Sequence, residues 1–195
     1  MVIGFGLKCL ILFCQLPNPN QLPDFQRGLW IRAISIASPD NIPRILQVTE
    51  DLSITDVYIQ IVVGGYAYYQ SDYLPRSEIL TRTSGPDYAP FDSIMPVLKK
   101  RGIRVHAWVN MCLAWSLAEP PESLNHVLRT HPEWFSTDVN NRNMVDYSYQ
   151  DWRGFGLEGL FLDPAQYQVR QHFAKICAEI AVRYQVEGIH LDFIR

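Results

Sequence analysis

Four short apolar runs alternate with helical patterns along this chain, and this alternation most strongly constrains its fold. The runs cover residues 28–37, 56–63, 103–110 and 188–195. The second run, DVYIQIVV, is nearly all apolar, as expected for a parallel strand covered on both faces. Strands joined by connections of helix length predict a parallel sheet with right-handed crossovers.

Three of the segments between these runs carry apolar residues at helical spacing. The apolar positions are Ile42, Ile45, Leu46 and Thr49 in the first, Phe91, Ile94, Met95 and Leu98 in the second, and Val169, Phe173, Ile176, Cys177, Ile180 and Tyr184 in the third. Gly102 supplies a C-cap for the second, and Asp163 with Pro164 is expected to open the third. A long loop is expected over residues 66–89, and a short helix near residues 123–129.

Two architectures fit this alternation, a doubly wound open sheet and a (β/α)8 barrel of the TIM type. No Gly-x-Gly-x-x-Gly follows the first run, so the usual dinucleotide signature of the open sheet is absent. Polar residues within the runs share the parity of the other candidate pore-facing positions; they are Arg32, Gln60, His106, Asn110, His190 and Asp192. We therefore predict a TIM-type barrel, truncated after about four βα units, with Gln60 interpreted as a hydrogen-bonded buried group.

Composition and charge exclude several classes of function. A net charge of −3 leaves no basic face for a nucleic acid. The four cysteines show no CxxC spacing, so neither a zinc site nor a disulfide framework is predicted, and no cofactor is expected. No lysine lies at the end of a predicted strand, which argues against Schiff-base chemistry.

Residues 1–26 are interpreted as a leader and linker, and residues 27–195 as the N-terminal half of a barrel domain. Residues 2–14 are apolar around Lys8, without a typical cleavage site, which is consistent with a degenerate export signal or a loose terminal segment. The stretch is too short to span a membrane. These residues leave the localisation open.

Asp192 is the strongest catalytic candidate. It lies at the C-terminal end of a predicted strand, where the active sites of β/α barrels are found. A carboxylate there can act as nucleophile, general acid/base or electrostatic stabiliser. His190 shares its parity, and His106, Trp108 and Asn110 share that of the neighbouring strand, so these side chains are expected to position a substrate. Arg195 is expected to orient a carboxylate or to cap the barrel end.

Ten aromatic residues fall in the two longest expected loops, and they are Tyr66, Tyr68, Tyr69, Tyr73, Tyr88, Trp115, Trp134, Tyr147, Tyr149 and Trp152. Flat rings with polar tips suit sugar rings, and Tyr68 and Tyr69 are predicted to contact a ligand. The alternative is a satellite core beneath the loops, which is expected to hold for several of them, Trp134 included.

Several motifs occur in a consistent order over residues 27–195. They are RGLW at 27–30, VYIQIV at 57–62, YYQS at 68–71, PRS at 75–77, HAWVN at 106–110, HPEW at 131–134, LDP at 162–164 and GIHLD at 188–192. Together they resemble the glycosyl hydrolase-like 10 family of bacterial β/α-barrel glycosidases. The resemblance implies hydrolysis of a polysaccharide, with Asp192 near the cleaved bond, and favours an extracellular or cell-envelope location.

The third strand of that family usually continues Asn-Pro-Tyr-Arg, whereas Asn110 in this chain is followed by Met111, Cys112 and Leu113. Sugar cleavage normally requires two carboxyl groups, and the partner of Asp192 is expected outside this chain.

Two other functions stay open: a non-catalytic carbohydrate-binding barrel, and a barrel enzyme that uses a metal or phosphate. His106 and His190 lack a spaced third ligand, so no metal site is predicted. An incomplete barrel is also expected to self-associate through its open sheet edges.

Overall fold

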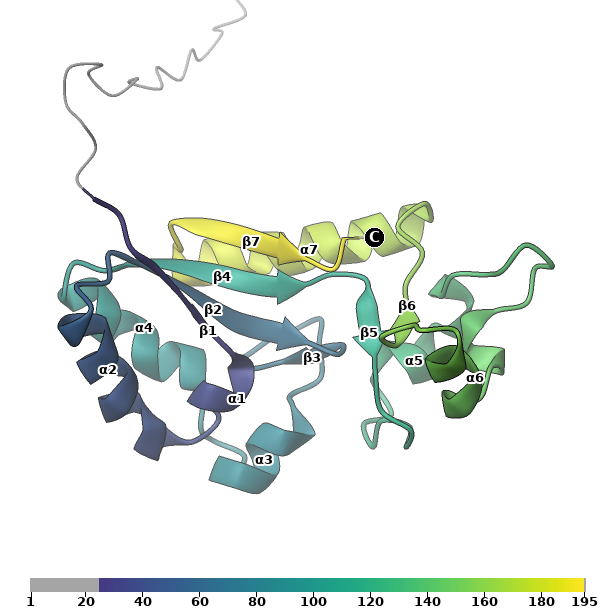
Figure 1. Ribbon diagram of the computed structural model, residues 1–195, viewed down its shortest axis with the longest axis horizontal. Coiled ribbons are helices and arrows are strands. Elements are labelled where there is room, and N and C mark those ends of the chain that lie inside the picture. Colours follow the sequence, from purple (N-terminus) through teal and green to yellow (C-terminus); the bar gives the residue numbers. More distant parts are fainter. Residues whose placement is uncertain (1–24, 195) are drawn as a thin grey trace, which may run out of the picture.

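The computed structural model describes residues 25–194, which fold around a sheet of five strands (Figure 1). Arg195 and the candidate export signal lie outside the described residues. Four parallel strands are adjacent in chain order, and a short one, β3 (Tyr66–Ala67), folds back antiparallel on the second. The parallel strands are β1 (Gly28–Ile31), β2 (Asp56–Val63), β4 (Arg104–Asn110) and β7 (Gly188–Asp192). The predicted α/β fold with a parallel sheet is confirmed.

The register of the four parallel strands aligns their C-terminal ends along one edge of the sheet. Trp30 is paired with Tyr58, Tyr58 with His106, and His106 with Gly188. Within residues 25–194, β1 and β7 each have one strand neighbour, so the sheet is curved but not closed into a barrel.

Three longer helices cross over between the parallel strands and pack on the same face of the sheet (Figure 1). They are α2 (Ile42–Asp51), α4 (Pro90–Lys100) and α7 (Tyr167–Tyr184). The shorter helices are α1 (Ala33–Ile36), α3 (Glu78–Ser84), α5 (Val127–Thr130) and α6 (Tyr149–Gly154). Single 3-10 turns occur at η1 (Pro39–Asn41), η2 (Pro132–Trp134) and η3 (Met144–Asp146). Among residues 25–194, no helix is both long and apolar enough to cross a membrane.

The main core lies between the sheet and these helices. Val57, Ile59 and Ile61 of β2 are fully buried and contact apolar residues of the helix layer. Fully burying one such side chain contributes about 2 kcal/mol to stability. Because side chains alternate along a strand, the residues between them project toward the opposite, inner face. The pattern of the sequence therefore separates a packed outer face from an inner face that can carry polar chemistry.

Several element boundaries differ from the prediction, and the expected long loop over residues 66–89 contains β3 and α3. Two of the differences have a clear physical reason. The first strand ends at Ile31 rather than at residue 37, because Ala33 and Ile36 turn back into the core in α1 and the Ala33 N–H donates to Gln60 Oε1 (3.2 Å). The third long helix begins at Tyr167 rather than at Asp163, whose carboxylate instead accepts the Ala165 N–H in a tight turn (2.8 Å). In the first case burial and a hydrogen bond to β2 override the sequence pattern, and in the second a hydrogen bond within the turn does so.

A second, smaller core lies beyond the C-terminal end of β4. The strands β5 (Leu113–Trp115) and β6 (Leu160–Phe161) pair antiparallel there. Phe135, Trp152 and Trp115 are buried in this core, and Tyr66 packs against it from β3. The expected satellite core is thus confirmed for Tyr66, Trp115 and Trp152, which do not form an open lid.

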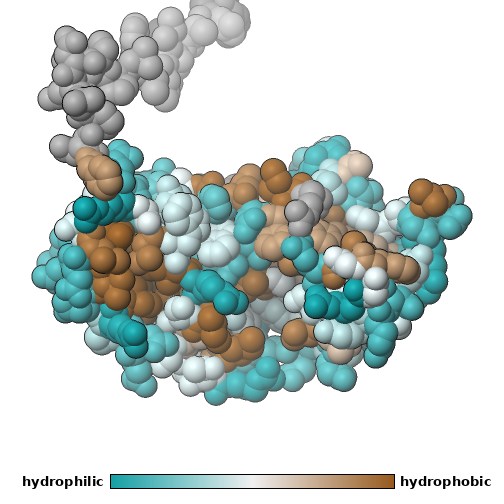
Figure 2. Space-filling view, in the orientation of Figure 1, coloured by the Kyte–Doolittle hydropathy of each residue, from teal (hydrophilic) through white to brown (hydrophobic). Residues whose placement is uncertain are grey.

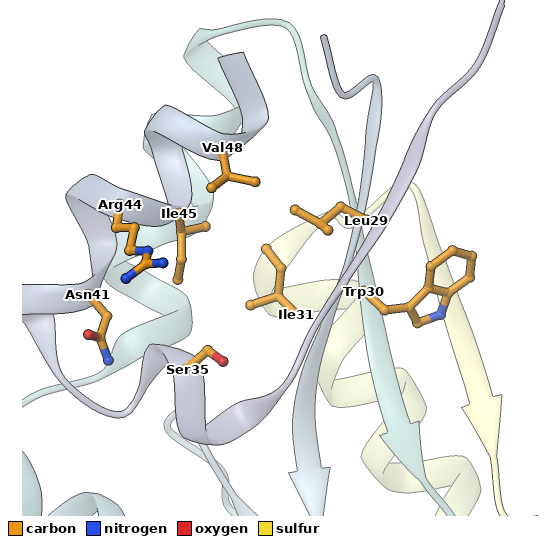
Figure 3. Close-up of a pocket in the computed structure, with 8 residues that line it drawn as sticks. All are labelled: Leu29, Trp30, Ile31, Ser35, Asn41, Arg44, Ile45 and Val48. Carbon is orange, nitrogen blue, oxygen red and sulfur yellow. The ribbon is translucent and has the colours of Figure 1, made fainter. Parts of the chain in front are cut away.

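A groove of about 290 Å³ separates the outer face of β1 from α2 (Figure 3). Leu29 and Ile31 point into it, toward Ile45 and Val48 of α2, while Trp30 points to the other side of the sheet. Figure 2 shows apolar surface over this corner of the molecule. The groove lies beside the free edge of β1, so apolar surface and unpaired backbone occur together there.

We expect the 195-residue chain to self-associate, because β1 and β7 expose free sheet edges among residues 25–194. Light scattering after size exclusion should give a mass above that of one chain, rising with protein concentration. Leu191→Lys places a charge on β7, where Leu191 is 46% exposed, and should shift the population toward monomer. Val182→Lys, at an exposed position on α7, is the matched control. A monomer at every concentration would contradict this expectation.

Candidate active site at the strand ends

A row of stacked rings crosses the inner face of the sheet. Trp30 stacks on Tyr58 with ring centroids 4.4 Å apart, and Tyr58 stacks on His106 at 4.6 Å. These residues occupy one row of the register on β1, β2 and β4. Next in this row is Gly188, where an added Cβ would lie 2.8 Å from His106 Nδ1, so a glycine leaves room for the ring. The sequence analysis did not single out Trp30 and Tyr58 as candidate site residues, although they share the strand parity of the polar residues that it named.

The N-terminal ends of the strands are joined by a buried ion-pair cluster. Asp56 accepts two hydrogen bonds from the Arg104 guanidinium (2.7 and 2.6 Å), one from the Thr55 hydroxyl (2.7 Å) and one from His106 Nε2 (3.0 Å). The Arg104 hydrogen bonds are the main reason that the pKa of Asp56 lies well below its usual range. The end of a β/α barrel opposite its active site serves stability. His106 is therefore a structural residue, which corrects the expectation that it positions a substrate.

The Asp56→Asn variant is expected to lose about 2 kcal/mol of unfolding free energy at neutral pH. The loss should be smaller than for a fully buried pair, because the Arg104 side chain is 45% exposed. Folding lowers the pKa of Asp56, so its ionised carboxylate adds its full contribution to the unfolding free energy above about pH 4. This contribution is lost as the pH falls further. Urea unfolding at several pH values should therefore show the two proteins converging in acid. Asp40→Asn, at an exposed position, is the control, and equal stability of Asp56→Asn and wild type at pH 7 would refute the assignment.

Asp192 lies at the opposite, C-terminal end of the sheet, on the inner face of β7. Its Oδ2 accepts a hydrogen bond from Trp108 Nε1 (3.1 Å), and its Oδ1 accepts one from the Phe193 N–H (2.8 Å). Phe193 adopts a left-handed backbone conformation with φ 51°. Such a conformation is uncommon for a bulky residue and is typical of functional sites. One donor on each oxygen fixes the plane of the carboxylate.

Asn110 is paired with Asp192 across β4 and β7 and is 5% exposed. Its Oδ1 accepts a hydrogen bond from Gln60 Nε2 (3.3 Å), and Gln60 Oε1 in turn accepts the Ala33 N–H (3.2 Å). This chain of bonds satisfies Gln60, as expected from its mid-strand position, and orients the Asn110 amide. The Nδ2 atom of Asn110 has no hydrogen-bond partner among residues 25–194, so a donor remains beside the carboxylate.

His190 lies one inward-facing position before Asp192 and is enclosed by aromatic rings. Its ring is edge-on to Tyr58, Trp30 and Trp108, with centroids 5.6, 6.1 and 6.2 Å away. The strands themselves thus bring Asp192, Trp108, Asn110 and His190 together. Arg195 lies outside the described residues.

Tyr69 does not belong to this group. It is 1% exposed, its hydroxyl donates to Glu179 Oε2 (2.8 Å), and its ring packs edge-on against Tyr184. These contacts anchor the loop after β3 on α7, and the expectation that Tyr69 binds a ligand is wrong. Tyr68 is 3% exposed and packs in a core cluster with Leu80. It therefore offers no open face beside Asp192, and the expectation that Tyr68 contacts a ligand is wrong.

His126 is a buried residue that the sequence analysis did not single out. Its Nε2 donates to the Gly64 carbonyl (2.7 Å), and its Nδ1 accepts the Leu128 N–H (3.1 Å), which assigns a neutral ring. Burial lowers the pKa of His126, because the charged form would lose its hydration. The ring also contacts Tyr66 and Trp115. A single histidine in an irregular loop carries no periodic signal, so only the fold reveals this role.

Comparison with known proteins agrees with the geometry of the strands. A sequence model of the family described as glycosyl hydrolase-like 10 matches residues 26–194. The chain belongs to this family. Its membership confirms the resemblance noted in the sequence.

Two curated relatives show how much of such proteins the chain represents. It is 28% identical over 187 residues to "Glycosyl hydrolase DigH" of Escherichia coli, covering 85% of this chain and 41% of that protein. It is 25% identical over 156 residues to "Glycosyl hydrolase YngK" of Bacillus subtilis, covering 76% of this chain and 26% of that protein. The chain therefore spans about two fifths or less of these relatives.

Solved structures show the same fold at low sequence identity. A hypothetical protein from Ruminiclostridium thermocellum superposes with a TM-score of 0.59 at 15% identity, covering 86% of this chain and 76% of that one. The noncanonic maltogenic α-amylase AmyB from Thermotoga neapolitana superposes with a TM-score of 0.50 at 16% identity, covering 84% of this chain and 38% of that one. The parallel sheet is thus of the kind found in glycosidase TIM barrels, although it is not closed within residues 25–194.

Proposed function

We propose that this chain contributes Asp192 as one of two carboxyl groups that hydrolyse a glycosidic bond in a poly- or oligosaccharide. The observation that carries the proposal is the orientation of Asp192 at the C-terminal end of β7, with one N–H donor on each oxygen. This is the end of a barrel strand at which catalysis occurs. The remaining lone pairs of the carboxylate are available to attack an anomeric carbon or to exchange a proton.

The neighbouring side chains have complementary roles in this proposal. Trp108 orients the carboxylate, Asn110 donates a hydrogen bond to a sugar hydroxyl from Nδ2, and His190 borders the same site. We expect the second carboxyl group from outside residues 25–194, because the C-terminal ends of β1, β2 and β4 carry no carboxylate. The distance between the two groups decides between retention and inversion of the anomeric centre.

A carbohydrate-binding barrel without hydrolysis is the alternative, and one experiment separates the two. The longest natural chain that carries residues 26–194 is incubated with a panel of polysaccharides. Pull-down measures binding, and a reducing-end assay measures cleavage. New reducing ends support the hydrolase, and binding without cleavage supports the binding barrel. Neither binding nor cleavage on any glycan of the panel would count against both.

A further inference from the structure

His126 connects two parts of the chain that lie far apart in the sequence, the turn after β2 and the start of α5. Its ring is fully buried and lies against this turn, since a Cβ built on Gly65 would be 2.3 Å from its Nε2. Nε2 donates to the Gly64 carbonyl (2.7 Å), and Nδ1 accepts the N–H of Leu128 (3.1 Å). Both ring nitrogens are therefore used, and both partners are backbone groups.

This pairing leaves no place for a second proton on the His126 ring. A backbone N–H occupies the lone pair of Nδ1, whereas both nitrogens of a charged imidazole are donors. His106 differs, because the Asp56 carboxylate lies 3.0 Å from its Nε2. His131 likewise lies 3.0 Å from the Glu133 carboxylate. A proton on either of those rings gains an ion pair, but a proton on His126 costs a hydrogen bond.

The surroundings of the ring also disfavour its charged form. It packs against the rings of Tyr66 from β3 and Trp115 from β5, with centroids 4.7 and 5.2 Å away. Among residues 25–194, the charged groups that act on the ring are Glu78 of α3, which favours a proton, and Arg129 of α5, which opposes one. Burial is the largest influence, and it lowers the pKa of His126.

The loop before α5 is held at a second point, by Glu78. Its Oε1 accepts the Tyr66 hydroxyl and the N–H groups of Glu122 (2.7 Å) and Ser123 (2.9 Å). Burial opposes the charged form of Glu78, but these hydrogen bonds outweigh it and lower its pKa, while burial raises the pKa of Tyr66. Glu78 therefore stays charged and Tyr66 neutral between about pH 5 and 7.5. This second attachment does not change over that range.

We propose that His126 is a pH-sensitive contact, which holds α5 and the loop before it (residues 121–131) on the turn after β2 at neutral pH and releases them in mild acid. Arg129 Nε donates to the Pro121 carbonyl (2.7 Å), so the segment can move as one unit. Since the ring is fully buried, it takes up a proton from solvent only when this segment opens. The proton then fills the lone pair that accepted the Leu128 N–H, and it opposes closure.

The direction of the pH effect follows from the lowered pKa of His126. The neutral ring stabilises the closed segment fully above about pH 6.5, the ordinary pKa of histidine, and this stabilisation is lost as the pH falls below that value. Release uncovers the rings of Tyr66 and Trp115, which His126 contacts in the closed arrangement. None of these contacts involves Asp192, so the pH response does not depend on the proposed function.

Hydrogen exchange measured by mass spectrometry tests the release directly. The 195-residue protein is labelled at about pH 7.5 and about pH 5, and each rate is divided by the intrinsic exchange rate at that pH. The amides of residues 126–131 should open about tenfold more often at the lower pH, since exclusion of the proton from a histidine allows at most about thirtyfold there. The amides of residues 56–63 in β2 report global unfolding and should change less. No pH effect on residues 126–131, or an equal effect on β2, would overturn the proposal.

His126→Asn is the matched variant that cannot titrate. The asparagine amide can still accept the Leu128 N–H, but it binds no proton in this pH range. Opening of residues 126–131 should then be the same at both pH values, and His126→Gln serves if the first variant does not fold. His172→Asn is the control, because burial also lowers the pKa of His172 on α7, and it should keep the tenfold response. A response that persists in the His126 variants and disappears in His172→Asn would show that His126 is not the responsible group.

Discussion

The Asp192→Asn variant is expected to hydrolyse its glycan about a thousandfold more slowly than wild type, because the amide can neither attack nor exchange a proton as the carboxylate does. The assay uses the longest natural chain that carries residues 26–194. Folding should be retained, since an amide oxygen can still accept a hydrogen bond from Trp108 Nε1 or from the Phe193 N–H. Circular dichroism and urea unfolding check this directly.

Two further variants are measured together with Asp192→Asn, one that removes a hydrogen bond to Asp192 and one that serves as a control. Trp108→Phe keeps a ring but removes the indole N–H, and the loss of one hydrogen bond to a charged group is expected to lower kcat about tenfold. Asp51→Asn, at an exposed position on α2, should leave the rate unchanged. Near-wild-type hydrolysis by the Asp192→Asn variant would remove Asp192 from the chemistry.

The Gly65→Ala variant is expected to lose about 3 kcal/mol of unfolding free energy. Gly65 has φ +72°, and a Cβ built on it would lie 2.3 Å from Nε2 of the buried His126 ring. Left-handed strain costs about 1 kcal/mol, and forcing a methyl group against a packed ring adds about 2 kcal/mol. Urea unfolding at low protein concentration measures the change.

Gly64→Ala is a closely matched control for this effect. Gly64 also has a positive φ, +58°, but the nearest atom to its Cβ position is the Ala114 carbonyl oxygen at 3.9 Å. Only the strain of about 1 kcal/mol is then expected. In a His126→Ala background the cost of Gly65→Ala should fall to that of Gly64→Ala, because the ring that the methyl group meets is gone. The same cost with and without the His126 ring would show that the steric explanation is incorrect.

The strand residues of the candidate site could be predicted because a strand has a strict period of two. Once residues 188–192 are identified as a parallel strand, Asp192 and His190 must share a face, and the same holds for Trp108 and Asn110. The parity does not show which of the inward-facing positions lie at the C-terminal end of the strand, where catalysis is expected. The sequence therefore grouped His106 with Asn110, whereas the partners of His106 place it at the opposite end, with Asp56.

The loops between strands could not be predicted in the same way. Tyr68 and Tyr69 are neighbours in the sequence, yet one packs against α3 and the other against α7. The contact of Tyr69 with Glu179 spans 110 residues, and that of His126 with Gly64 spans 62. No local pattern records such contacts, because they depend on how independent elements pack.

The sequence by itself determined the alternation of strands and helices, the shared face of His190 and Asp192, and the place of Asp192 at a strand end, because these follow from periodicities of neighbouring residues. It did not determine the place of Arg32, which was expected on the inner face but lies exposed after the end of β1. Only the tertiary structure decided which aromatic residues are core, which donors hold Asp192, and where Glu78 meets Tyr66. The physical reason is that burial and hydrogen bonding in irregular segments arise between residues far apart in the chain, whose approach is set by the packing of the whole sheet and its helices.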